Sequence, residues 1–178
     1  MSARPSPQRI AIARAVLALV WAAAIVIAIG DRVPTTDTDI PIAAAALLTA
    51  YPLIDVVASL ASAQQHGTAL RVNAAISALA AVSVGATAFG SDAGAALAAF
   101  GAWAAVSGAM QLVLALRGSR QVPMLISGGL STLAGISFLS AAGMHDPHLA
   151  VLGGYMAVGA VLYLVSARRG RATAPLAG

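Results

Sequence analysis

Residues 97–118 read LAAFGAWAAVSGAMQLVLALRG, and the pattern returns 52 residues later, at 149–170, as LAVLGGYMAVGAVLYLVSARRG. Ten of the 22 positions are identical, and both segments end in Arg-Gly. Trp103 of the first segment corresponds to Tyr155 of the second, and Tyr51 lies another 52 residues before Trp103. This fixed spacing indicates an internal repeat. Each copy holds about 20 apolar residues, enough to cross a hydrocarbon core about 30 Å thick.

The composition is that of a membrane protein. Hydrophobic residues make up 60% of the chain and charged residues 9%, whereas soluble proteins carry about 25% charged residues. The predicted partner is therefore the lipid bilayer. Cysteine is absent, which excludes disulfides, thiol catalysis and cysteine-metal sites. The net charge of +4 does not predict nucleic-acid binding, because the arginines lie at the ends of apolar segments, where they determine membrane topology.

The apolar segments predict an all-α integral membrane bundle of six transmembrane helices. The expected spans are residues 10–30, 40–62, 70–89, 93–116, 122–143 and 148–167. They form three tandem helical hairpins, at about 10–63, 70–117 and 122–168, between tails at 1–9 and 169–178. The first segment also fits a secretory signal peptide, with Ala28-Ile29-Gly30 as the cleavage site. We interpret it as a retained helix, because the repeat requires a partner for the second span.

The charges alternate between the two sides of this six-span arrangement. Nine of the ten arginines fall on one side: Arg4, Arg9, Arg14, Arg71, Arg117, Arg120, Arg168, Arg169 and Arg171. Five of the six aspartates fall on the other side, together with Arg32: Asp31, Asp37, Asp39, Asp92 and Asp146. The positive-inside rule then places both termini in the cytoplasm of a bacterial cell, with the spans in the cytoplasmic membrane.

Small residues recur at every fourth position in the third and fifth spans. The two stripes, 50 residues apart, are Ser77, Ala81 and Gly85, and Ser127, Ser131 and Gly135. Such stripes allow neighbouring helices to approach closely, so they are predicted to be internal seams of the bundle.

Asp55 is the only acidic residue inside a predicted span, which makes it a candidate functional group. Arg14, Arg71, Asn73 and Gln111 occupy similar depths near the same membrane surface, so a polar cluster of these residues is expected. One interpretation is a structural ion pair, with Arg14 as the favoured partner, that joins the first hairpin to the second. The other is a protonatable relay group of a small proton-linked transporter.

The short outer loop His145-Asp146-Pro147-His148 is a second candidate site. The unperturbed pKa of imidazole is about 6.5, so His145, Asp146 and His148 would suit a sensor of external acidification. An ordinary solvated turn is the alternative. The loop has too few ligands for a metal site, and no metal or other cofactor is expected.

The chain lacks the sequence motifs of common enzymes. Walker A, HExxH, GxSxG and CxxC patterns do not occur. No predicted span carries paired carboxylates or a histidine-acid pair that would support hydrolysis. The sequence therefore favours a protein that is not an enzyme.

Residues 100–118 (FGAWAAVSGAMQLVLALRG) and 124–169 resemble the HdeD-like family of small bacterial membrane proteins. Gly101, Trp103, Ser107 and Gly108 match the recurring second-helix pattern of that family, and residues 146–149 resemble its proline-containing outer turn. The resemblance implies three helical hairpins, no catalytic residues and a role in tolerance of acid or envelope stress. Association with a second copy or another membrane protein along the small-residue stripes is the expected mode of action.

Overall fold

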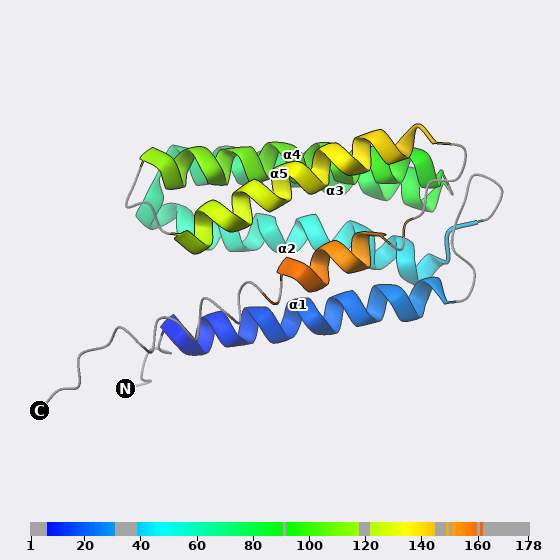
Figure 1. The fold of residues 1–178 in the computed structure, drawn as a ribbon, viewed down its shortest axis with the longest axis horizontal. Helices are drawn as coiled ribbons and strands as arrows, with labels where there is room; N and C mark the ends of the chain where they lie inside the picture. Colours follow the sequence, from blue (N-terminus) through cyan, green and yellow to red (C-terminus); the bar gives the residue numbers. More distant parts are fainter. Residues whose placement is uncertain are drawn as a thin grey trace, which may run out of the picture.

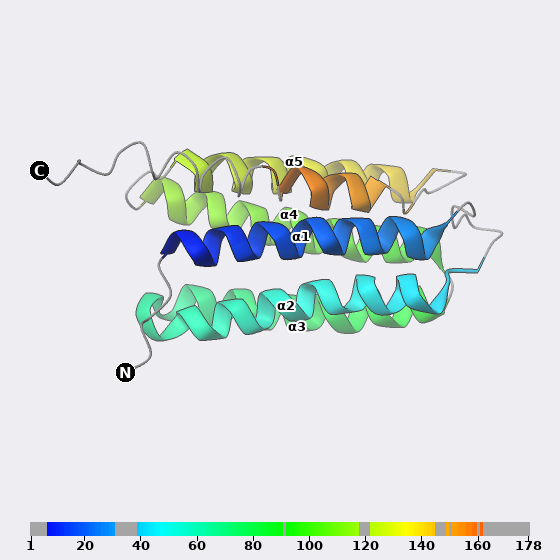
Figure 2. The ribbon, with the colours of Figure 1, turned by 90° about the horizontal axis from the view of Figure 1, so that it is seen from below.

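The computed structural model describes residues 7–30, 39–90, 92–117, 122–144, 149, 151–159 and 161. These residues are helical apart from turns and short connections. The helices are α1 (Pro7–Ile29), α2 (Ile42–His66), α3 (Thr68–Phe89), α4 (Ala93–Arg117) and α5 (Val122–Ala142), followed by a helical segment at 151–159. The helices run antiparallel in succession and lie side by side (Figures 1 and 2).

Four helices are long and apolar enough to cross a membrane. They are Ile42–Leu60, Thr68–Phe89, Ala93–Arg117 and Leu125–Ala142. This confirms the all-α class, and the four helices coincide with four of the six predicted spans. In α1, among the residues whose side chains the structure describes, the apolar stretch is Leu19–Ile29.

The largest difference from the predicted boundaries lies between α2 and α3. The sequence predicts a turn at residues 63–69, whereas α2 continues to His66 and α3 begins at Thr68. Gly67 alone reverses the chain, with a φ of 70° that an L-residue with a side chain rarely adopts. Gly30 ends α1 in the same left-handed region, at φ 62°.

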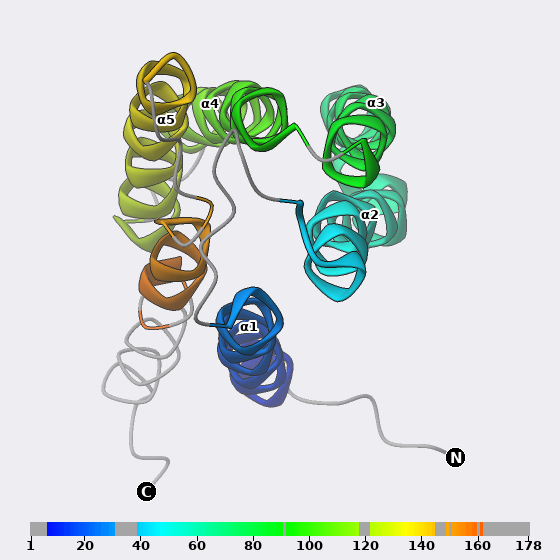
Figure 3. The same cartoon turned by 90° about the vertical axis from the view of Figure 1, so that its right-hand side faces the viewer.

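Viewed along its axis, the bundle is a ring of helices that follows chain order (Figure 3). Among the described helices, the most extensive contacts are those of α4 with α5 and of α2 with α3, and the contact of α1 with α2 is smaller. The most closely packed helices therefore belong to different predicted hairpins. In the predicted arrangement α2 ends the first hairpin and α3 begins the second, and α4 ends the second and α5 begins the third. The segment 151–159 closes the ring against α1, where Gly153 faces Val26.

The three seams of the ring use equivalent positions of the repeat. Thr49, Gly101 and Gly153 are spaced by 52 residues, and Gly85 and Gly135 by 50. Thr49 lies against Gly85 at the α2–α3 seam, and Gly101 lies against Gly135 at the α4–α5 seam. The two predicted small-residue stripes therefore do face neighbouring helices. Small residues suit this position because helices in lipid associate by close packing rather than by the hydrophobic effect.

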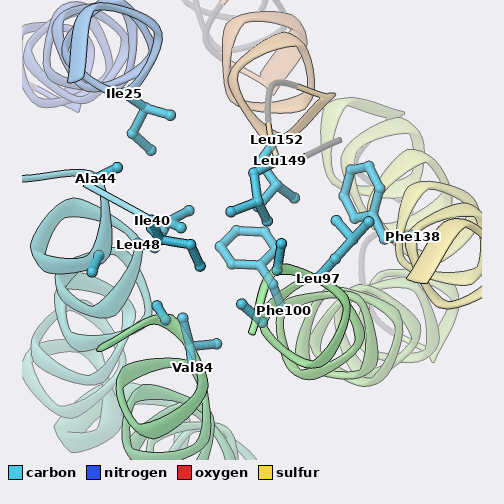
Figure 4. Packing of buried hydrophobic residues seen from close by; sticks show 14 of the residues in the cluster. Ile25, Ile40, Ala44, Leu48, Val84, Leu97, Phe100, Phe138, Leu149 and Leu152 are labelled. Carbon is cyan, nitrogen blue, oxygen red and sulfur yellow. The ribbon is translucent and has the colours of Figure 1, made fainter. Parts of the chain in front are cut away.

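The apolar cluster formed by the described residues lies in one half of the bundle, and Figure 4 shows its packing from close by. Ile25, Leu48, Phe100 and Leu152 are fully buried, and they come from four different helices. These residues lie toward the end where Gly90 joins α3 to α4, which we call the Gly90 half. The opposite half, where Gly67 joins α2 to α3, is called the Gly67 half. In α1, the Trp21 indole Nε1 donates to the Leu47 carbonyl of α2 at 3.2 Å.

Candidate functional site

A polar network joins α2, α3 and α4 in the Gly67 half. Asp55 lies two turns beyond the buried Leu48 on the same face of α2, so its carboxylate is directed into the bundle. Asn73 Nδ2 of α3 donates to Asp55 Oδ2 at 2.8 Å and to Ser59 Oγ at 2.9 Å. Asn73 and Ser59 are buried, whereas Asp55 is half-buried. One amide group therefore links two residues of α2 to α3.

Ser77 extends this network to α4. Its hydroxyl donates to Asp55 Oδ2 at 2.7 Å, and Trp103 Nε1 donates to Ser77 Oγ at 2.9 Å. The indole N–H is a donor only, so Ser77 must accept from Trp103 and give its own proton to Asp55. The direction of the bonds is thus determined: Trp103 donates to Ser77, and Ser77 donates to Asp55.

The three aromatic residues spaced by the repeat meet around Phe100. The ring centroid of Trp103 lies 5.1 Å from that of Phe100, and the centroids of Tyr51 and Tyr155 lie 5.9 and 6.3 Å from it. Trp103 and Tyr155 meet Phe100 edge to face, which aromatic rings prefer. The Tyr155 hydroxyl also donates to Ser131 Oγ of α5 at 2.8 Å. The three aromatic residues that the repeat relates therefore lie in one aromatic layer.

The structure joins only part of the predicted polar cluster. Asn73 bonds to Asp55 as expected. Arg71 is exposed, and among the described residues no ion pair joins it to Asp55. Gln111 is half-buried on α4 and takes no part in the described network. The Arg14 side chain lies outside the described residues, so its pairing with Asp55 stays a prediction.

The predicted outer loop also lies outside the described residues. His145, Asp146 and His148 therefore stay candidates from the sequence alone. Among the residues that the structure describes, no group of three histidine, cysteine or acidic side chains is placed to hold a metal ion.

Three members of the network were missed by sequence reasoning: Ser59, Ser77 and Trp103. Ser77 was assigned to a packing stripe, and Trp103 to the repeat, without any link to Asp55. A serine and a tryptophan separated by 26 residues carry no local pattern. The packing of α3 against α4 is what brings them together.

The repeat equivalent of Asp55 is Ser107, 52 residues later on α4. Its Oγ is inaccessible to solvent and has no hydrogen-bond partner in the described part of the chain. The equivalent position of α4 therefore lacks the carboxylate and its partners.

The structure also has an open hollow of about 440 Å³ on the exposed face of α2. It is lined by Ala50, Leu53, Ile54, Val57 and Ala58. This lining is apolar, so the hollow adds no polar group to the candidate site.

Trp103→Phe should lower stability modestly, because it removes one donor and leaves the Ser77–Asp55 bond in place. We expect a loss of about 1 kcal/mol, the net value of a typical hydrogen bond. Ser77→Ala should cost more, since it strands the indole N–H and removes a donor from Asp55. Thermal melts of the purified proteins in non-ionic detergent measure both, and an equal effect of the two changes would contradict the assigned network.

The chain matches no protein-family model, no curated protein and no solved structure. Its functional assignment therefore depends on the polar network and on the sequence pattern.

Proposed function

We propose that the protein is a non-catalytic integral membrane protein that supports tolerance of acid or envelope stress. In this proposal six spans cross the bacterial cytoplasmic membrane, and both termini are cytoplasmic. The four long apolar helices support the membrane location, and the distribution of arginines supports the orientation. The role in stress tolerance rests on the likeness of residues 100–118 and 124–169 to HdeD-like proteins.

One observation supports a structural role for Asp55: its chain of hydrogen bonds passes through Ser77 and ends at Trp103. A proton relay requires each member to accept one proton and release another. The indole Nε1 of Trp103 has no lone pair available to accept a proton. The described bonds therefore fit a lock between α2, α3 and α4 better than a conducting path.

The second candidate function is a small proton-linked transporter with Asp55 as the titrating group. The observation that favours it is a half-buried carboxylate within an apolar span, Ile42–Leu60. Acidic residues in such positions commonly serve ion or substrate pathways. In this alternative, proton exchange at Asp55 would proceed by a route other than the Ser77–Trp103 bond.

Two assays distinguish these functions. A deletion strain of the source bacterium should survive low pH less well than the parent, and a plasmid copy should restore survival. Proteoliposomes with the purified protein should show no proton-dependent or solute-dependent flux above that of empty liposomes. Unchanged survival would remove the stress role, and a flux that Asp55→Asn abolishes would establish the transporter instead.

A further inference from the structure

The closest helix contacts divide the bundle into two pairs of helices. Figures 2 and 3 show α2 beside α3 and α4 beside α5. Among the described helices, the contact within each pair is more extensive than the contact of α3 with α4, which joins the pairs. The small-residue contacts follow the same division, because Gly85 faces Thr49 within the first pair and Gly101 faces Gly135 within the second. Since helices in lipid associate by close packing, each pair is a compact unit.

Each of the two outer helical segments is bonded to one of these pairs. Trp21 Nε1 of α1 donates to the Leu47 carbonyl of α2 at 3.2 Å. The Tyr155 hydroxyl, in the segment 151–159, donates to Ser131 Oγ of α5 at 2.8 Å. These bonds assign α1 to a first unit with α2 and α3, and the segment 151–159 to a second unit with α4 and α5.

Among the described residues, one side-chain hydrogen bond joins the first unit to the second. Trp103 Nε1 of α4 donates to Ser77 Oγ of α3 at 2.9 Å, and both residues are buried near the middle of their helices. The ring of Trp103 also meets that of Tyr51 edge to face, with centroids 5.8 Å apart. By comparison, three described side-chain bonds join α2 to α3 within the first unit. The polar connection between the units therefore depends on Trp103.

Toward the Gly90 end, the units are joined by the chain itself and by apolar packing. Leu48 of the first unit and Leu97 of the second are fully buried in the same apolar cluster. Gly153 of the second unit faces Val26 of the first. Apolar contacts are non-directional, so this end can act as a pivot for a small rotation of one unit against the other.

We propose that the two units are rigid bodies that pivot about the Gly90 end and separate in the Gly67 half, and that the Ser77–Trp103 bond is the latch that keeps them together. Rigid-body rotation about an interface is a common form of conformational change. Apolar contact alone resists such a separation weakly in a bilayer, because lipid chains replace the lost contacts. A hydrogen bond between buried groups has no such replacement in lipid. The latch is independent of the proposed role in stress tolerance.

The test measures distances between pairs of spin labels in the full-length protein in liposomes. The chain has no cysteine, so labels attach only to introduced cysteines. Val72 of α3 and Val113 of α4 are exposed positions of the Gly67 half on different units. Trp103→Phe removes the donor of the latch and keeps an aromatic ring. In this variant the distance between labels at positions 72 and 113 should gain a longer population that the wild type lacks.

Two further label pairs show whether each unit moves as one body. Val57 with Val72 reports on the first unit, and Val113 with Ile126 reports on the second, and all four positions are exposed. Trp103→Phe should leave both of these distances unchanged, because the seams within the units do not involve the indole N–H. Equal lengthening within and between the units would indicate general loosening and would contradict the latch.

Trp21→Phe is the matched control, because it removes the same indole donor from a bond that lies within the first unit. It should leave the distance between positions 72 and 113 as in the wild type. If the Trp103→Phe protein does not fold, Ser77→Ala removes the same bond from the other unit and takes its place.

Two other results would overturn the proposal. They are an unchanged distance between positions 72 and 113 in the folded latch variant, and an equal lengthening of that distance in Trp21→Phe. Neither depends on the survival assay, so the latch and the stress role succeed or fail separately.

Discussion

Gly135→Ala is expected to disrupt the packing of α4 against α5 and to cause the largest loss of stability of any single methyl addition in the bundle. A Cβ atom at position 135 would lie 2.3 Å from the Ala105 nitrogen and 2.5 Å from the Gly101 oxygen. Both are backbone atoms, so no side-chain rotation relieves the overlap. The two helices must separate along the seam.

The expected cost is at the upper end of the range for overpacking, about 3 kcal/mol or more. Gly108 and Gly128 form the same contact two turns away, where an added Cβ would meet backbone atoms at 2.6 and 2.7 Å. Alanine at either position should therefore also destabilise the seam. Thermal melts in detergent, with folded yield as a second readout, measure the effect.

Gly129→Ala is the matched control for this seam. Gly129 belongs to the same helix, α5, and a Cβ atom there would meet nothing within 4 Å. Because alanine favours helix over glycine by about 1 kcal/mol, this variant should melt at or above the temperature of the wild type. Equal melting temperatures of the Gly135→Ala and Gly129→Ala proteins would contradict the assigned packing.

Asp55→Leu is expected to give the second large effect, because it leaves donors of Asn73 and Ser77 without their acceptor. Both donor residues are buried, and each stranded donor costs about 1–3 kcal/mol. Asp55→Asn should be much milder, since the amide oxygen can occupy the position of Oδ2 and accept both bonds. Ser83→Ala on the exposed face of α3 should have little effect, because the Ser83 hydroxyl bonds only within its own helix.

The same variants test the predicted ion pair with Arg14. If Arg14 pairs with Asp55, Asp55→Asn strands a buried charge at a cost of about 3–5 kcal/mol. The double variant Asp55→Asn with Arg14→Gln should then recover much of that loss, whereas the double variant with Arg71→Gln should not. A stable Asp55→Asn protein would exclude the ion pair and leave the neutral network of Asn73 and Ser77 as the lock.

Much of the fold could be predicted from the sequence because membrane helices follow simple rules of length and polarity. The boundaries of α4 and α5 were predicted to within one residue of Ala93–Arg117 and Val122–Ala142. The extension of α2 to His66 was not, because polar residues 64–66 look like a loop. They lie in a helix because Gly67 alone suffices to turn the chain.

The polar site was predicted only in part. Asp55 and Asn73 were identified because a polar residue in an apolar span is conspicuous. Ser77 and Trp103 were not linked to them, since serine and tryptophan are ordinary in membrane helices. Arg71 was expected in the cluster from its depth, but depth does not specify the face of a helix. Arg71 and Asn73 are two residues apart and therefore lie on different faces of α3, one exposed and one buried.

The sequence by itself determined the all-α class, the positions of the helices long and apolar enough to span a membrane, and the repeat. These properties depend on local composition, because a span must be apolar over its whole length to enter lipid. Only the tertiary structure decided which helices pair most closely and which polar groups meet. The pairing of α2 with α3 depends on Gly85 facing Thr49, and that of α4 with α5 on glycines that face one another. The Asp55 network depends on the rotation of three helices about their axes. Both arise from contacts between distant residues, which a one-dimensional pattern does not specify.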